Sequence, residues 1–212
     1  MSFQVATAAA TPRADGKTED RVAVHRLQDA MVIVVADGAG GIPGGDVAAD
    51  AVARGVADAI ENKPETFLRA EGLVALLCRL DDDIERMPMA GETTAVVVVV
   101  TEHGVFGASC GDSGSWLVEE VGYDDLTADQ RRTLRLGSGR TKPAPFVRAG
   151  IDGTLVVASD GLFNFARPEA ICLNARGISL SAAACGLVAS VRTERGDLMD
   201  DVAVAVVRAS RW

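Results

Sequence analysis

The sequence MVIVVADGAGG at residues 31–41 joins a short apolar run to an aspartate and a glycine-rich turn. An apolar run of this length, bounded by turn residues, predicts a strand that is buried in a sheet. The preceding segment, residues 21–27, alternates Val22 and Val24 with polar neighbours and predicts a second strand. We therefore expect the two segments to pair, with Asp37 at the end of the buried strand.

Two helical patterns follow this pair of strands. Apolar residues recur with a helical period at residues 44–60, and again at residues 65–87, where leucines gather on one side. We expect a long helix in each segment.

The rest of the sequence contains further strands and shorter helices. Strands are predicted at residues 93–101, 105–110, 115–118, 154–158 and 202–207, and helices at residues 168–174 and 179–192. Residues 122–150 form a less regular, basic segment. Strands in clusters followed by helices in clusters predict an α+β fold, in which antiparallel sheets are covered by helices.

Length and composition favour one folded domain that spans residues 1–212. The chain is 48% hydrophobic and 24% charged, and no internal repeat or linker divides it. The net charge of -9 argues against nucleic acid as a partner, because a phosphate backbone needs a basic surface. Clustered carboxylates suit divalent cations instead, although solubility alone also explains an acidic balance.

The cysteines and the N-terminus indicate the compartment. The 4 cysteines are widely spaced and form no CxxC pair, which predicts reduced cysteines in the core. Residues 1–12 lack the pattern of a secretory signal, and no apolar run approaches the ~20 residues that a membrane span needs. We therefore expect a cytoplasmic protein.

Aspartates stand at the ends of three predicted strands. Asp37 and Asp160 each follow an apolar strand and precede a glycine, and Asp200-Asp201 stands just before the final strand. In an antiparallel sheet the start of one strand lies beside the ends of its neighbours, so these carboxylates can meet at one edge. Clustered carboxylates repel one another unless a cation lies between them. Oxygen ligands favour Mg²⁺ or Mn²⁺ over Zn²⁺.

Each of these features has a simpler explanation when it is taken alone. An Asp-Gly pair after a strand is often an ordinary turn, and Asp200-Asp201 could be a solvated strand start. The glycine-rich residues 37–45 are either a plain turn or a place where phosphate approaches a helix N-terminus. They match neither GxxxxGK nor GxGxxG, which argues against nucleotide binding.

Taken in chain order, six short motifs resemble those of the metal-dependent protein phosphatases, the type 2C serine/threonine class. The motifs are Glu19-Asp20, ADGAGG at 36–41, GETTA at 91–95, CGDS at 110–113, ASDGLF at 158–163 and Asp200-Asp201-Val202. Each motif is short, so the specificity of the resemblance lies in their order. The motifs cover nearly the whole chain.

The resemblance implies a sandwich of two antiparallel β-sheets flanked by helices, with a binuclear metal site at one end. Asp37 would bridge both metals, and the carbonyl oxygen of Gly38 would bind one of them. Asp160 and Asp200 would complete the ligands of the first metal. These three aspartates are the expected catalytic residues.

Four other residues take further roles in the same resemblance. Glu19 would hold a metal through water, and Asp112 would help Asp160 to hold a third, weaker metal. Asp20 and Asp201 would support the site, although Asp20 could equally belong to a strand-entry turn.

The expected reaction is hydrolysis of phosphoserine or phosphothreonine, with a metal-activated water attacking the phosphate directly. The expected cofactors are two or three divalent cations, Mn²⁺ or Mg²⁺. The expected partner in signalling is a phosphorylated protein, such as a Ser/Thr kinase or its target, with no membrane partner and a monomeric state. The scarcity of lysine beside arginine, with much Ala and Val, suggests a bacterial source.

Two positions depart from the family pattern. Asp15 stands where relatives usually carry an arginine that binds the substrate phosphate, and Gly114 stands where they carry the arginine of Gly-Asp-Ser-Arg. Arg13 or Lys17 could replace the first arginine, and the alternative is that both are ordinary solvated charges.

The segment beside the expected site is short. Residues 119–150 take the place of the flap that relatives carry, and its basic residues include Arg131, Arg132, Arg135, Arg140, Lys142 and Arg148. Such a basic lip could attract a phosphorylated segment. The alternative is a solvated helix and loop, since residues 126–134 have helical spacing.

Two other functions remain open. One is a phosphatase dedicated to a single regulator, such as an anti-sigma-factor antagonist. The other is a catalytically silent relative that binds phosphoproteins or metal as a regulatory module. The intact Asp37, Asp160 and Asp200 argue against silence, and the missing arginine at position 15 argues for it.

Overall fold

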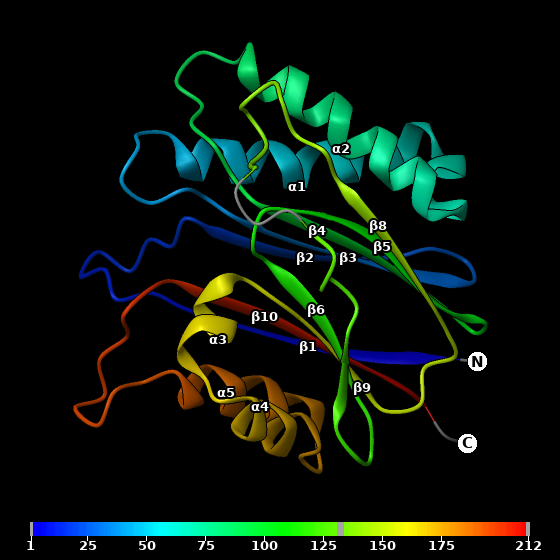
Figure 1. Ribbon diagram of the computed structural model, residues 1–212, viewed down its shortest axis with the longest axis vertical. Helices are drawn as coiled ribbons and strands as arrows, with labels where there is room; N and C mark the ends of the chain where they lie inside the picture. Colours follow the sequence, from blue (N-terminus) through cyan, green and yellow to red (C-terminus); the bar gives the residue numbers. More distant parts are fainter. Residues whose placement is uncertain (1, 131–133, 211–212) are drawn as a thin grey trace.

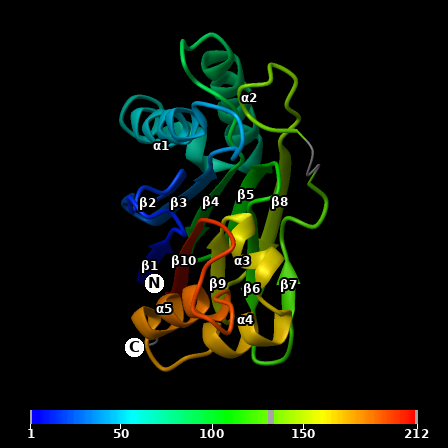
Figure 2. The ribbon, with the colours of Figure 1, turned by 90° about the vertical axis from the view of Figure 1, so that its left-hand side faces the viewer.

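The computed structural model describes residues 2–130 and 134–210, which form a sandwich of two five-stranded antiparallel sheets (Figure 1). The two sheets pack face to face in the middle, and helices cover the outer face of each sheet (Figure 2). This arrangement confirms the α+β sandwich that the sequence predicts.

One sheet contains the strand pair from which the sequence analysis started. Its strands, in spatial order, are β2 (Asp20–Arg26), β3 (Ala30–Asp37), β4 (Ala95–Thr101), β5 (Gly104–Cys110) and β8 (Ala144–Ala149). The long helices α1 (Gly45–Asn62) and α2 (Ala70–Glu85) cover its outer face, where Val52, Leu76 and Leu77 are fully buried. The short 3-10 helix η1 (Pro64–Leu68) connects the two helices.

The second sheet joins the two ends of the described chain. Its strands, in spatial order, are β1 (Phe3–Ala10), β10 (Val202–Ala209), β9 (Thr154–Ala158), β6 (Gly114–Val118) and β7 (Tyr123–Asp125). Its outer face is covered by α3 (Asp160–Phe165), α4 (Pro168–Ala175) and α5 (Leu180–Ser190), with Leu162, Ile171 and Leu187 fully buried beneath them.

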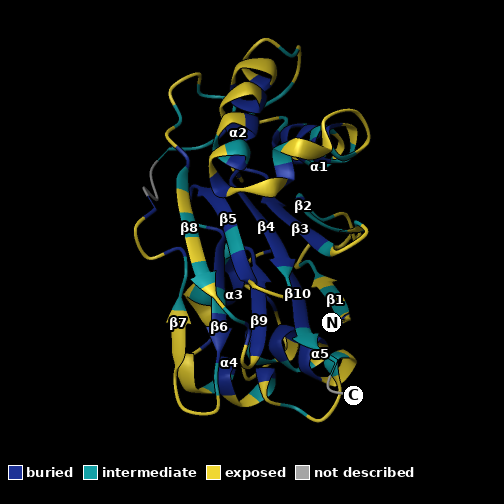
Figure 3. Cartoon of the chain, turned by 90° about the vertical axis from the view of Figure 1, so that its right-hand side faces the viewer, coloured by how far each residue is buried: buried dark blue, intermediate teal, exposed yellow. Residues whose placement is uncertain are grey.

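Burial on both faces explains why the central strands have continuous apolar sequences. In β3, Ile33 and Val35 lie in the core between the sheets, whereas Val32 and Val34 pack against the helix layer. All four side chains are inaccessible to solvent, as are those of most of β4 (Figure 3). Strict alternation of apolar and polar residues marks a strand with one wet face, and these strands have none.

The structure contains four elements that the sequence analysis did not predict. β1 is an alanine-rich strand at a sheet edge, and β8 alternates half-buried and exposed residues within the segment expected to be irregular. β7 has 3 residues and α3 has 6, which is too short for a periodic pattern to be visible.

Three further expectations need correction. The helix expected over residues 65–87 is broken at Arg69, whose backbone is extended between η1 and α2. Residues 126–130 form turns instead of the helix suggested by their spacing, and Arg131 and Arg132 lie outside the described residues. Cys78 and Cys185 are exposed on the outer sides of α2 and α5, so the prediction of buried cysteines holds only for Cys110 and Cys172.

Across residues 2–130 and 134–210, no helix combines the length and the apolar composition needed to cross a membrane.

Candidate active site

Four aspartates from distant parts of the chain come together at one end of the sandwich. Asp37 is the last residue of β3 and lies opposite Asp20, the first residue of β2, in the antiparallel register. Asp160 begins α3 directly after β9, and Asp112 lies in the turn between β5 and β6. Asp37 and Asp160 lie at the strand ends where the sequence predicts that carboxylates converge.

Three of these carboxylates are close enough to share a cation. Asp37, Asp112 and Asp160 each offer one oxygen, and these three oxygens lie within 4.8 Å of one another. All three residues are half-buried. Asp112, which the resemblance implies only for a third metal, therefore lies in the same group as Asp37.

The backbone around Asp37 is held on both sides. Its carbonyl oxygen accepts hydrogen bonds from the Thr94 amide and the Thr93 hydroxyl, each at 2.8 Å. A side chain on the next residue, Gly38, would come within 2.5 Å of the backbone of Gly45 at the start of α1. Glycine is needed at position 38 because α1 begins directly against the strand end.

Burial and mutual repulsion raise the pKa values of Asp37 and Asp20. Burial, followed by the charges of Asp20 and Asp160, raises the pKa of Asp37 to about 10. Burial also raises the pKa of Asp20 to about 7, with the charge of Asp201 adding to the effect. Both shifts indicate that a positive charge at this place would stabilise the ionised forms.

Several carboxylate oxygens at this end are buried and have no hydrogen-bond partner among the described residues. They are both oxygens of Asp20, one of Asp112 and one of Asp201. Buried polar atoms are almost always satisfied by a donor, a water or an ion. A set of carboxylate oxygens without histidine or cysteine is the kind that Mg²⁺ and Mn²⁺ prefer. The residues therefore fit a site for divalent cations.

Asp201 connects the site to the N-terminal segment. Its Oδ2 accepts hydrogen bonds from the Thr18 hydroxyl at 2.9 Å and from the Glu19 amide at 2.6 Å. A Cβ on Gly161 would overlap the carbonyl oxygen of Asp201, so α3 can pack here only with glycine at that position. Asp201 thus fixes Glu19 from a position remote in sequence.

Asp200 lies beside the three clustered carboxylates and is not one of them. It is exposed, and its Oδ1 accepts a hydrogen bond from the Asp201 amide at 2.9 Å. Burial raises the pKa of Asp160, and the charges of Asp112 and Asp200 raise it further. Asp200 is therefore near enough to act on Asp160 electrostatically.

The two candidates for phosphate binding stand in different surroundings. The guanidinium of Arg13 forms an ion pair with the carboxylate of Glu19, so its charge is already compensated. Lys17 is exposed, and its backbone amide donates to the Asp15 carboxylate at 3.0 Å. Within the described part of the chain, neither side chain forms an ion pair with the clustered aspartates.

Of two residues near Asp160, Asn164 was not identified from the sequence, and Arg135 was predicted only as one of the basic residues of the flap segment. Asn164 donates to Oδ2 of Asp160 at 2.9 Å, and its spacing of four residues is that of neighbours on a helix. That signal is visible only once α3 is known. Arg135 lowers the pKa of Asp160 through its positive charge, against the larger effect of burial. No local motif marks Arg135, because it reaches the site through a long-range backbone pairing.

Comparison with known families identifies the chain. A profile described as protein phosphatase 2C matches residues 12–170, which is most of the sequence. The chain belongs to the protein phosphatase 2C family. The match confirms the family that the ordered motifs predict and, with it, the enzyme class of a protein phosphatase.

Solved structures of bacterial phosphatases share the fold. The serine/threonine phosphatase Stp1 from Staphylococcus aureus has a TM-score of 0.82 at 18% identity, over 100% of this chain and 96% of that chain. The phosphatase MsPP from Mycobacterium smegmatis, in complex with cacodylate, has a TM-score of 0.76 at 22% identity, over 99% of both chains. The catalytic domain of PstP, solved with 2 manganese ions, has a TM-score of 0.72 at 18% identity, over 97% of both chains. No curated protein matches in sequence.

In the phosphatase, other side chains pack closely beside Gly114. A Cβ on Gly114 would come within 3.0 Å of the Phe163 ring and 3.1 Å of the Thr127 hydroxyl. The preceding Ser113 is fully buried and shares a hydrogen bond of 2.6 Å with the Thr94 hydroxyl. Close packing around position 114 therefore leaves little room for a side chain there.

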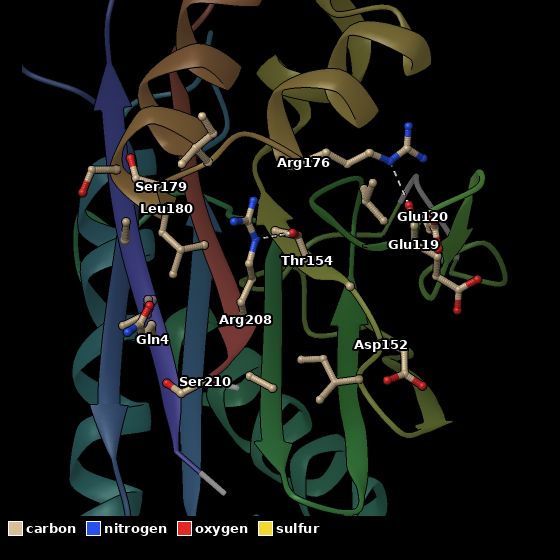
Figure 4. Close-up of a pocket in the computed structure, with 18 of the residues that line it drawn as sticks. Gln4, Glu119, Glu120, Asp152, Thr154, Arg176, Ser179, Leu180, Arg208 and Ser210 are labelled. Atoms are coloured by element: carbon tan, nitrogen blue, oxygen red, sulfur yellow. Dashed lines mark hydrogen bonds between the residues drawn. The ribbon is translucent and has the colours of Figure 1, made fainter. Parts of the chain in front are cut away.

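A large groove of the phosphatase lies at the opposite end of the sandwich (Figure 4). Arg208 projects there from β10, and it donates to the Thr154 hydroxyl and the Gly177 carbonyl, each at 2.7 Å, and to the Ala175 carbonyl. Arg176 donates to the Glu119 carbonyl at 2.8 Å. These arginines hold the loops together, and the groove contains none of the clustered aspartates.

Proposed function

We propose that the phosphatase hydrolyses phosphoserine or phosphothreonine in a protein substrate, using divalent cations held by aspartates at the strand ends. The observation that carries the proposal is the convergence of Asp37, Asp112 and Asp160 within 4.8 Å in a chain of the protein phosphatase 2C family. The 2 manganese ions in the PstP structure support a metal site in this fold.

The clustered carboxylates would hold the cations directly. Asp37 would bridge two ions, as the family resemblance implies, and Asp112 and Asp160, each with an oxygen within 4.8 Å of the other two, would bind beside it. Asp200 and the Gly38 carbonyl are the proposed additional ligands. When bound, two divalent cations activate water for attack and offset the charge that develops on the phosphate. Since every proposed ligand is an oxygen atom, Mn²⁺ and Mg²⁺ are the candidate ions.

Neighbouring residues orient these ligands. Asn164 occupies one oxygen of Asp160, which leaves the other oxygen free to face a cation. Asp20 is buried against Asp37 and has two unpartnered oxygens, so it can accept hydrogen bonds from water at the site. Asp201 fixes the backbone of Glu19, the other residue proposed to act through water.

The proposal also covers the compartment, the partner and the oligomeric state of the enzyme. The chain would act in bacterial signalling in the cytoplasm, on a Ser/Thr kinase or its target, as a monomer. Residues 1–212 would form one catalytic domain with a short flap at residues 119–150.

The test is hydrolysis of p-nitrophenyl phosphate and of a phosphothreonine peptide, measured with Mn²⁺, with Mg²⁺ and with EDTA. We expect turnover of both substrates with metal and none with EDTA. A folded protein that turns over neither substrate with any metal would overturn the proposal in favour of the silent binding module.

A further inference from the structure

We infer that Arg135 binds the phosphate of the substrate, in place of the arginine that relatives carry where this chain has Asp15. The inference rests on the proposed function and adds a residue from the short flap segment to the site. In the N-terminal segment, Arg13 is paired with Glu19. The loop at residues 134–141 offers another arginine, Arg135.

Backbone pairing brings the loop at residues 134–141 to the aspartates. Gly38, the residue after Asp37, pairs with Thr93, and Thr93 pairs in turn with Leu136. The Thr93 amide donates to the Leu136 carbonyl at 3.0 Å, and the Leu136 amide donates to the Thr93 carbonyl at 2.8 Å. Leu136 itself is fully buried. The residue before it, Arg135, is therefore carried on a strand-like segment two pairings away from the end of β3.

A buried carboxylate holds this loop in one conformation. Asp81 of α2 is only 3% exposed, and it accepts hydrogen bonds from the amides of Gly137, Gly139 and Thr141 at 2.7, 3.0 and 2.9 Å. Gly137 and Gly139 both have positive φ, which turns their amides toward the carboxylate. The conformation that presents Arg135 is thus organised from the helix layer.

Contacts on the other side of the loop complete its attachment. Cys110, at the end of β5, donates to the Leu134 carbonyl at 2.9 Å and shares a hydrogen bond of 2.5 Å with the Thr141 hydroxyl. The Ser138 hydroxyl donates to the Arg135 carbonyl at 2.7 Å. The backbone of Arg135 is therefore fixed while its side chain remains uncommitted.

Arg135 carries a guanidinium on the segment that pairs beside the end of β3. The residue is half-buried, and the next residue, Leu136, pairs with Thr93, which also pairs with Gly38 beside Asp37. Within residues 2–130 and 134–210, Arg135 forms no ion pair. A guanidinium on a rigid loop can hold two phosphate oxygens at once, as a lysine cannot. Among the described residues 2–130 and 134–210, Arg135 combines an unpaired guanidinium with a fixed backbone on the segment that pairs beside the end of β3.

The test compares Arg135→Gln and Arg135→Lys with the wild-type enzyme. Arg135→Gln should raise the KM for the phosphothreonine peptide and the inhibition constant of inorganic phosphate by about 10-fold or more, because a charge-assisted hydrogen-bond pair is lost. Arg135→Lys should recover part of this loss. The metal concentration for half-maximal activity should stay the same or fall, because a positive charge beside Asp160 has been removed.

The matched control is Arg140→Gln, an exposed arginine in the same loop, which should leave KM and phosphate inhibition unchanged. Unchanged KM and phosphate inhibition in Arg135→Gln would overturn the inference. A need for more metal together with a lowered Tm would also overturn it, since that result indicates a structural role.

A measurement of phosphate binding tests the role of Arg135 independently of the proposed hydrolysis. Calorimetric titration of inorganic phosphate into the Mg²⁺-loaded protein needs no turnover. Binding that is present in the wild type and about 10-fold weaker in Arg135→Gln supports Arg135 even if the wild type hydrolyses nothing. Binding of equal strength in both proteins contradicts it, whatever the activity.

Asp81 is the corresponding positioning residue. Asp81→Asn replaces an acceptor oxygen with an amide that faces donors, so the loop should loosen and KM should rise. Because Asp81 acts through Arg135, the double variant with Arg135→Gln should have a KM no higher than Arg135→Gln alone. Additive increases in KM would show that Asp81 acts on the substrate by another route.

Discussion

The two ends of the sandwich both contain charged side chains that are buried or half-buried, and they differ in how that charge is satisfied. At one end Asp20, Asp112 and Asp201 have buried carboxylate oxygens without partners, and the pKa of Asp37 is raised to about 10, chiefly by burial. At the other end Arg208 donates to two backbone carbonyls and a hydroxyl.

The difference distinguishes charged groups that stabilise the fold from charged groups that bind a ligand. A half-buried ion that donates hydrogen bonds to several groups of the chain stabilises the fold that surrounds it. A group of buried carboxylates that repel one another is held in place by the rest of the fold and is completed by a cation from outside. Substitutions at the two ends should therefore have opposite consequences for activity and stability.

The largest effect is expected for Asp37→Ala. Activity with saturating Mn²⁺ should fall on the order of 1000-fold or more, because the proposed bridge between two ions is lost. The Tm in EDTA should not fall, since the group removed is a buried carboxyl that burial and neighbouring carboxylates make costly to ionise. The exposed Asp152→Ala, at the opposite end, is the matched control and should behave as wild type. Near-normal turnover of Asp37→Ala would show that the assigned site is wrong.

At the other end, Arg208→Met should reverse this pattern. The free energy of unfolding should fall by about 2 kcal/mol, because the Ala175 and Gly177 carbonyls lose their donor. The kcat should be unchanged. Urea denaturation with and without the substitution measures the effect, and the exposed Lys63→Met serves as control. A loss of kcat without a loss of stability would remove the distinction between the two ends.

A smaller effect is expected when pH and metal are varied together. Burial raises the pKa of Asp20 to about 7 and is the largest cause of the raised pKa of Asp37, about 10. The metal-free fold therefore binds more protons than the unfolded chain above the usual Asp range, and its stability should decline as pH rises through 7. Mg²⁺ competes with these protons, so its stabilising effect should grow with pH.

Thermal melts at pH 5.5, 6.5, 7.5 and 8.5, with Mg²⁺ and with EDTA, test this expectation. The gain in Tm from Mg²⁺ should increase by a few degrees, on the order of 3 °C per kcal/mol, across the range. The increase should be much reduced in Asp37→Asn. A gain in Tm that is constant with pH would contradict a carboxylate site.

The smallest effect is expected for Asp112→Asn. Asp112 lies within 4.8 Å of the other two carboxylates, but the resemblance implies that it serves a weaker metal. The Mn²⁺ concentration for half-maximal activity should rise about 3-fold to 10-fold, with kcat largely retained at saturating metal. Titration at limiting Mn²⁺ measures the change, and wild-type behaviour there would exclude Asp112 from the metal site.

Part of the site could be predicted because its signals are local. A buried strand followed by Asp-Gly is visible in a few residues, which is how Asp37 and Asp160 were identified at strand ends. The order of the short motifs then indicated the family. The roles of Asp37, Asp112, Asp160, Asp200 and the Gly38 carbonyl in metal binding all stay predictions.

The remaining parts could not be predicted, for physical reasons that differ. β8 alternates half-buried and exposed residues, but its exposed positions are Pro145, Val147 and Ala149, so its sequence does not alternate apolar with polar residues. Cys78 and Cys185 lie on the outer sides of helices, where apolar composition nearby gives no measure of exposure. Arg135 was predicted only as one of several basic residues in its segment, since its relation to the aspartates depends on the pairing of Leu136 with Thr93.

The sequence by itself determined the apolar strands, the two long helical patterns and the aspartates at strand ends, because these depend on contacts between near neighbours in the chain. Only the tertiary structure decided which carboxylates meet, that Arg13 is paired with Glu19, and that Asp81 fixes the loop of Arg135. Those contacts join residues far apart in sequence, and the register of the strands and the packing of the two sheets set their distances.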